Sequence, residues 1–114
     1  MKNNELILVE KVLKANLHEQ TERLKIMFDM LISKEEDIHF DSSSYLDFIK
    51  RKIIEADDHI EAFKKLSKLC NFNLEEEIAT LKEQINISVK RIEKEKQAIE
   101  KRSLFKIVNK KENA

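Results

Sequence analysis

The sequence predicts an all-α fold, an antiparallel bundle of three long, coiled-coil-like helices, and three observations lead to it. The 114 residues include no glycine and no proline, although average usage would give a chain of this length about 14 of them. Apolar residues recur at steps of three and four over long stretches, between charged residues that make up 39% of the chain. Aromatic residues make up only 6%, so leucine and isoleucine must form the core. Dimerisation through the helices is the alternative use of the same apolar stripes.

The lack of glycine and proline also disfavours several other classes of protein. Sheet folds need turns with positive φ, which glycine supplies at the least steric cost. Phosphate-binding loops need glycine because only glycine lets the backbone come close to the ligand. We therefore expect neither a sheet nor a nucleotide-binding loop, and the length fits a single domain over residues 1–114.

The first helix is predicted over residues 3–32. A polar residue, Gln20 or Thr21, occupies the slot between Leu17 and Leu24, where it can set the register of packing at some cost in stability. The apolar positions of this helix are Leu6, Val9, Leu13, Leu17, Leu24, Met27 or Phe28, and Leu31.

A charged and serine-rich connection is expected over residues 33–44. Ser33 and Glu36 have the spacing of a capping box, which predicts a fragment of helix inside the connection. Ile38 and Phe40 are the apolar residues of this segment, and we expect them to pack beneath it.

The second helix is predicted over residues 45–70, with Ser43 or Ser44 as its N-cap. Its apolar stripe is the most regular in the chain, because every step is three or four residues. The stripe consists of Leu46, Ile49, Ile53, Ala56, Ile60, Phe63, Leu66 or Ser67, and Cys70.

A short turn over residues 71–73 leads to a third helix over residues 74–108, followed by a tail over residues 109–114. Asn71 is expected in the left-handed conformation that ends many helices, and Asn73 is expected to be the next N-cap. The third stripe fades towards its end, so the end of this helix is expected to project beyond the bundle or to meet another molecule. The stripe consists of Leu74, Ile78, Leu81, Ile85, Ser88 or Val89, Ile92 and Ile99.

No residue pattern points to catalysis, a cofactor or a metal. His18, His39 and His59 lie on different segments and form no metal-binding motif, so we interpret them as solvated surface residues. Cys70 lies at the predicted C-terminal end of a helix, where the helix dipole does not favour the thiolate that a reactive cysteine needs. We interpret it as a small buried apolar residue.

The C-terminal region has the most unusual composition. From Lys90 onward there are nine basic and four acidic residues, a net charge of +5, so the rest of the chain carries −5. Basic and apolar residues mix within residues 101–108, which we take as the candidate partner-binding segment. Its members are Lys101, Arg102, Leu104, Phe105, Lys106 and Val108.

Four interpretations of this segment stay open. Its apolar residues cover the bundle or a second copy, or they dock in the groove of another protein. Alternatively, the lysines contact the phosphates of DNA or RNA, or the helix lies on a membrane surface. The chain contains no signature of a known nucleic-acid-binding module.

Three packed helices with two connections leave few loops for an active site, and loops carry a large share of catalytic residues. We therefore predict a non-enzymatic protein–protein interaction module, such as a small helical adaptor, a secretion-type chaperone or an inhibitor, whose partner is another protein or a second copy. In size and all-helical character the chain resembles bacterial export chaperones of the flagellar or type III kind. The first alternative is a nucleic-acid-binding accessory protein that uses the basic C-terminal helix, and the second is a structural coiled-coil oligomer.

The expected location is the cytoplasm. No stretch approaches the roughly 20 apolar residues that span a bilayer, and the first apolar run, residues 6–9, is too short for the apolar region of a signal peptide. Abundant lysine, isoleucine, asparagine and glutamate suggest an AT-rich genome of a bacterium or phage.

Overall fold

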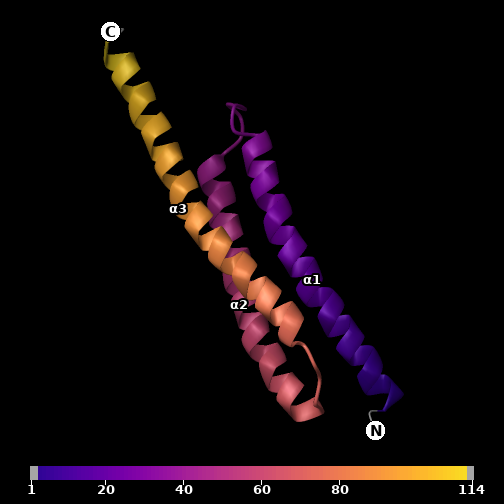
Figure 1. The fold of residues 1–114 in the computed structure, drawn as a ribbon. Helices are drawn as coiled ribbons and strands as arrows, with labels where there is room; N and C mark the ends of the chain where they lie inside the picture. The colour runs from indigo at the N-terminus through magenta and orange to yellow at the C-terminus, as the bar shows by residue number, and fades with distance from the viewer. Residues whose placement is uncertain (1–2, 113–114) are drawn as a thin grey trace.

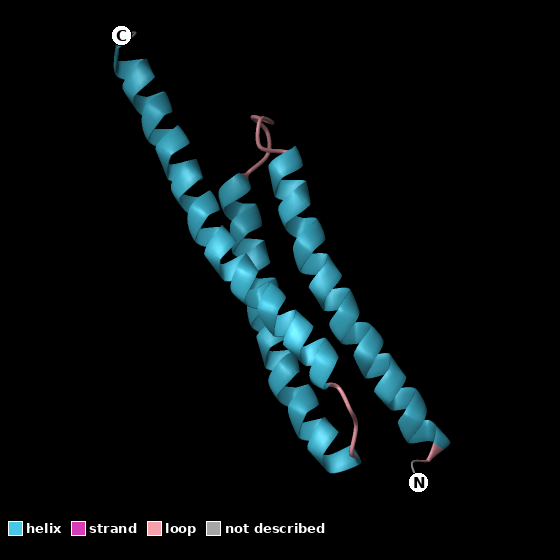
Figure 2. Cartoon of the chain, in the orientation of Figure 1, coloured by secondary structure: helices cyan, strands magenta, loops and turns pink. Residues whose placement is uncertain are grey.

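The protein folds into a rod of three long helices. A computed structural model describes the backbone of residues 3–112 and the side chains of residues 3–102. The helices are α1 (Asn4–Ser33), α2 (Ser42–Cys70) and α3 (Glu75–Glu112), and the described residues contain no strand (Figure 2). Each helix packs against the other two. The rod measures 76 × 19 × 16 Å, with α1 and α2 joined at one end and α2 and α3 joined at the other (Figure 1). The predicted all-α three-helix bundle is confirmed.

The fully buried residues of helix α1 begin only at Leu17. Its N-cap is Asn3, whose side chain accepts a hydrogen bond of 2.8 Å from the Glu5 amide. In the first half, Leu6 and Leu13 are half-buried, while Val9 is exposed, so its predicted place in the core is wrong. Because successive helical residues are about 100° apart, the run of four apolar residues cannot all face the bundle.

Thr21 occupies the polar slot in the core stripe of α1. Its hydroxyl is buried and donates a hydrogen bond of 3.0 Å to the carbonyl of Leu17, one turn earlier. Gln20 lies at the edge of the helix, where its Oε1 is 3.2 Å from Nδ1 of His59 on α2. The threonine therefore satisfies its polar group within its own helix, and the glutamine contributes a contact between helices.

The connection between α1 and α2 differs from its prediction in two respects. No α-helical fragment forms, because Ser33 is the last residue of α1 and its hydroxyl donates a hydrogen bond of 2.8 Å to the Met30 carbonyl. Ile38 is 84% exposed, so its predicted packing beneath the connection is wrong. Phe40 is half-buried, and its ring lies 5.3 Å from that of Tyr45. The packing of Phe40 on Tyr45 therefore anchors this end of the connection to α2, whereas Ile38 remains at the surface.

The helix α2 begins at Ser42, and its N-cap is Asp41 rather than the predicted Ser43 or Ser44. The Asp41 carboxylate accepts hydrogen bonds from the amide of Ser44 at 3.0 Å and from its hydroxyl at 2.7 Å. These bonds, the one from the amide first, hold the pKa of Asp41 below its ordinary value. An aspartate caps as well as a serine does, and this one lies at the correct spacing to bind two donors of the same serine.

The turn between α2 and α3 places Asn71 in the left-handed region, with φ 56° and ψ 45°, as predicted. The amide of Phe72 donates a hydrogen bond of 3.0 Å to the Ser67 carbonyl and so closes the end of α2. The next helix begins at Glu75, so the predicted N-cap, Asn73, lies one residue too early.

Asn73 has a different role, because its amide donates a hydrogen bond of 2.9 Å to Oε2 of Glu10 on α1. The following residue, Leu74, is buried in the core. The amide of Ile78 donates to the Leu74 carbonyl at 2.9 Å, as in the first turn of a helix. Core packing of Leu74 therefore decides where α3 starts.

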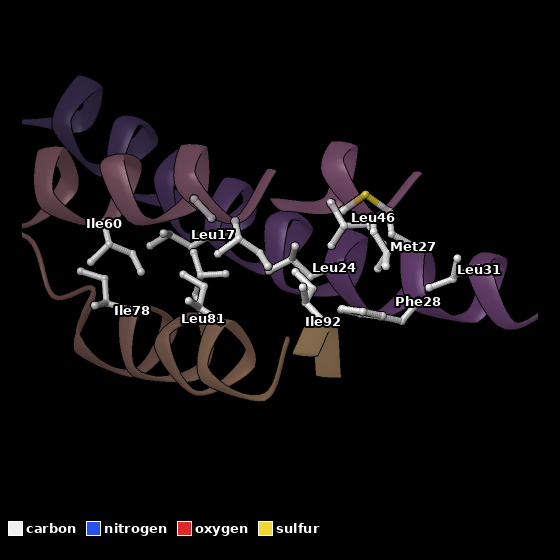
Figure 3. Close-up of a cluster of buried hydrophobic side chains, with 14 of the residues drawn as sticks. Leu17, Leu24, Met27, Phe28, Leu31, Leu46, Ile60, Ile78, Leu81 and Ile92 are labelled. Carbon is white, nitrogen blue, oxygen red and sulfur yellow. The ribbon is translucent and has the colours of Figure 1, made fainter. Parts of the chain in front are cut away.

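The core runs along the middle of the rod and draws on all three helices (Figure 3). In α3 the inward residue at the ambiguous step is Ser88, which is buried and within 3.2 Å of the Gln84 amide nitrogen, while Val89 is exposed. In α2 the stripe weakens towards its end, where Phe63 is half-buried and Leu66 is exposed. The buried apolar residues are Leu17, Leu24, Met27, Phe28, Leu31, Leu46, Ile49, Ile53, Ala56, Ile60, Phe72, Leu74, Ile78, Leu81, Ile85 and Ile92.

Among the described residues, no helix has a stretch that is both long and apolar enough to cross a membrane.

Candidate interaction surfaces

The end of α3 extends past the connection between α1 and α2 (Figure 1). The last apolar residue described on this helix is Ile99, which is half-buried against the core. Two residues later, Lys101 is exposed. The bundle therefore ends close to Ile99, and the remaining backbone of α3 continues as a single helix to Glu112.

Of the six predicted partner-binding residues, Arg102 has an internal partner. Its guanidinium forms an ion pair with the carboxylate of Glu35 in the connection between α1 and α2. Each side chain is a little over 40% exposed, so the pair links α3 to the connection at the surface. The backbone of the other predicted residues is helical, but four of their side chains lie outside the described part of the chain: Leu104, Phe105, Lys106 and Val108.

A second arginine of the basic C-terminal region also has a partner in the bundle. The Arg91 guanidinium carbon lies 4.9 Å from the centre of the buried Phe28 ring, a distance that allows a cation–π interaction. The lysines of the described part of this region are exposed: Lys90, Lys94, Lys96 and Lys101. Within residues 90–102, the exposed basic charge is therefore mainly that of lysines.

A surface that the sequence did not predict lies at the start of α1. Four large apolar side chains within two turns are exposed there, with Leu8 at 61% and Val12 at 64%. We call Ile7, Leu8, Val9 and Val12 the α1 apolar surface. The run from Leu6 to Val9 was the available signal, because four consecutive apolar residues on a helix must leave some outside a single stripe.

The histidines lie on the surface, as expected. His18, His39 and His59 are all exposed, and the ring of His59 stacks on Phe63 of the same helix at 5.9 Å. Within residues 3–102, no three His, Cys, Asp or Glu side chains come together as metal ligands could. Cys70, expected to be buried, is half-buried at the last residue of α2.

Comparison of the chain with protein-family models, with curated proteins and with solved structures finds no match in any of the three.

Proposed function

We propose that the chain is a non-enzymatic protein–protein interaction module, an antiparallel and coiled-coil-like bundle that presents helical surfaces to a partner. The α1 apolar surface is the observation that carries this proposal. Its residues Leu8 and Val12 are four apart, so they share one face of the helix. Contiguous exposed apolar side chains commonly mark sites of protein association.

Burial of this surface supplies a substantial driving force for association. Complete burial of one large apolar side chain contributes roughly 1.5–3 kcal/mol, and the α1 apolar surface has four such residues, each partly exposed. A partner helix that lies along α1 would cover Leu8 and Val12 together. This mode of recognition needs no movement within the bundle.

The proposal includes the biological forms of such a module, namely a cytoplasmic adaptor, a secretion-type chaperone or an inhibitor. The α3 extension, residues 101–112, is its second surface, since it leaves the bundle as a single helix. Where the partner is a second copy of the chain, the complex is a homodimer.

The experiment compares two aspartate substitutions at equally exposed apolar residues. Leu8→Asp changes the α1 apolar surface, whereas Ile54→Asp changes a residue of α2 that is also 61% exposed. Light scattering coupled to size exclusion gives the mass of each variant, and chemical crosslinking in the source cells captures partners. We expect Leu8→Asp to abolish the complex and Ile54→Asp to keep it. Equal loss in both variants, or a complex unaffected by either, would contradict the proposal.

The exposed lysines of α3 support a second candidate function, binding of nucleic acid. It predicts an affinity that falls steeply with salt and that is lost in Lys101→Glu with Lys106→Glu. Arg102 is a poor probe of this function, because its substitution also breaks the ion pair with Glu35. The interaction module predicts instead that Leu104→Asp with Phe105→Asp weakens partner binding, with little dependence on salt.

A further inference from the structure

A groove lies on the outside of the bundle between the end of α2 and the start of α3. Its volume is about 590 Å³. The side of α2 contributes residues 61–68, which is about two turns or 10 Å of helix. We call it the α2–α3 groove.

The floor of the α2–α3 groove is apolar. Phe72 and Leu74, from the turn between the helices, and Ile78 of α3 line it, and each is buried in the core. Ala79 lines the wall and is exposed, and its small side chain leaves the floor open. The groove therefore offers apolar contacts over a length that fits two turns of a bound helix.

The rim of the groove is basic. Four lysines line it, against the two carboxylates of Glu61 and Glu75: Lys64, Lys65 and Lys68 from α2, and Lys82 from α3. Lys64 Nζ is 3.6 Å from Oε1 of Glu61. The lining thus has twice as many cationic as anionic side chains.

Two of these lysines come from different helices, Lys64 from α2 and Lys82 from α3, and both line the groove. A hydrogen bond between the Lys64 and Lys82 amines, followed by the repulsion of their charges, lowers the pKa of Lys82. The same hydrogen bond, followed by the attraction of Glu61, raises the pKa of Lys64. The two amines have the same charge and line one groove, so a carboxylate bound there would offset their repulsion.

We propose that the α2–α3 groove binds an acidic amphipathic helix of a partner protein, with apolar residues on the floor and carboxylates at Lys64 and Lys82. Anchors at spacings of three, four and seven residues match the two turns of the groove. This inference rests on the proposed function, since it gives one surface of the interaction module the chemistry of its partner.

The charges of the chain itself argue that this occupant is not a second copy. The α1 apolar surface is flanked by Glu5 and Glu10 as well as by Lys11 and Lys14, so it has no excess of acidic residues to match the lysines of the groove. The C-terminal region is basic, with its net charge of +5 from Lys90 onward. Neither of the two proposed interaction surfaces therefore supplies the acidic helix that the groove would bind, and we assign this helix to a different protein. Self-association of the chain that is lost in Lys64→Glu with Lys82→Glu would overturn this assignment.

The test is a titration of the full chain against a fluorescently labelled synthetic helix, followed by anisotropy. The peptide carries leucines at positions i, i+3, i+4 and i+7, with glutamates on both sides of this stripe. We expect saturable binding that weakens at least tenfold in the variant Lys64→Glu with Lys82→Glu. The control variant, Lys25→Glu with Lys34→Glu, has the same change of charge at two exposed residues outside the groove. We expect it to bind within about twofold of the unchanged chain. Circular dichroism checks that both variants remain helical.

Two further comparisons test the apolar floor. A scrambled peptide of the same composition should bind at least tenfold more weakly, and Ala79→Glu should weaken binding of the original peptide, because it places a carboxylate in the groove. The inference is overturned if the peptide does not bind, if the scrambled peptide binds equally, or if the control variant loses as much affinity. It is also overturned if vesicles of an anionic phospholipid bind with the same dependence on Lys64 and Lys82 and displace the peptide.

The synthetic helix separates this inference from the proposed function. A peptide that fails to bind removes the groove as a site, while the Leu8→Asp experiment still decides whether the chain is an interaction module. Conversely, peptide binding with no effect of Leu8→Asp would support the groove and remove the α1 apolar surface.

Discussion

The middle of the rod and its two ends are stabilised by different interactions. In the middle, Leu24, Ile49 and Leu81 are at most 1% exposed, and packed apolar side chains fill the space between the three helices. At the ends, fewer helices lie side by side, and polar residues stabilise the ends of the helices. An N-cap at Asp41 begins α2 and a left-handed residue at Asn71 ends it.

The helix α1 shows this difference within a single element. Leu24 is 1% exposed and Leu8 is 61% exposed, although both are leucines of the same continuous helix. The regular spacing of apolar residues makes a helix amphipathic, but the number of neighbouring helices at each level decides how much of it is buried. Apolar residues that exceed this capacity remain exposed, as Leu8 and Val12 do.

The largest expected effect contrasts these two leucines. Leu24→Ala leaves a cavity in the middle of the core and should lower the free energy of unfolding by about 2–5 kcal/mol. Leu8→Ala removes the same atoms from an exposed side chain and should change the free energy of unfolding by less than about 0.5 kcal/mol. Urea denaturation of the two variants measures both values. Similar losses would mean that the start of α1 is covered in solution, as in a dimer.

The turn at the end of α2 should give an intermediate effect. Asn71 has φ 56°, a conformation that costs a residue with a Cβ roughly 1–2 kcal/mol, and asparagine tolerates it better than most. Asn71→Ala should therefore destabilise the protein by about 1 kcal/mol, whereas Asn71→Gly should leave its stability unchanged or slightly higher. Thermal denaturation of the two variants checks this. A loss of stability with glycine would show that the asparagine side chain itself is needed.

The ion pair at the other end should contribute less. Arg102 and Glu35 are both partly exposed, and pairs of this kind contribute about 0.2–1 kcal/mol. A double-mutant cycle with Arg102→Ala and Glu35→Ala measures their coupling free energy by chemical denaturation. We expect the coupling to fall as salt is added. A coupling that exceeds this range and resists salt would place the pair in a more buried environment, with α3 held firmly at the connection.

The smallest effect concerns the cap of α2, and it depends on pH. In the folded protein, hydrogen bonds from Ser44 hold the pKa of Asp41 below its ordinary value of 3.8. The ionised carboxylate therefore stabilises the fold above about pH 4, and this contribution is lost as the pH falls through the lowered pKa. Asp41→Asn keeps a capping oxygen without the charge, so its melting temperature should fall less than that of the unchanged chain on acidification. Identical acid profiles of the two proteins would contradict the assignment of Asp41 as an ionised cap.

Side-chain chemistry within one turn explains why some local features were predictable. Asn71 was expected in the left-handed region because asparagine accepts it, and the structure places it there. The cap of α2 was missed by two or three residues, because Asp41 and the serines that follow it are all good caps. The structure uses Asp41, whose carboxylate accepts hydrogen bonds from both the amide and the hydroxyl of Ser44.

The candidate surfaces were less predictable, because exposure is a property of the assembled helices. Lys101 and Arg102 were expected to act alike, yet Lys101 is exposed and Arg102 pairs with Glu35, a residue 67 positions away. Likewise, no spacing in the sequence shows that Lys64 and Lys82 line the same groove, since this groove exists only where α2 packs on α3. Contacts between distant positions leave no periodic signal along a single helix.

The sequence by itself determined that the chain forms three long helices, because it lacks glycine and proline and repeats apolar residues at helical spacing. It also determined most of the inward faces, since the side chains that share a stripe must be buried together. The tertiary structure alone decided where burial stops along α1, which charged residues are paired, and where lysines from two helices border one groove. These features depend on how far each helix overlaps its neighbours, and the periodicity of one helix contains no information about that overlap.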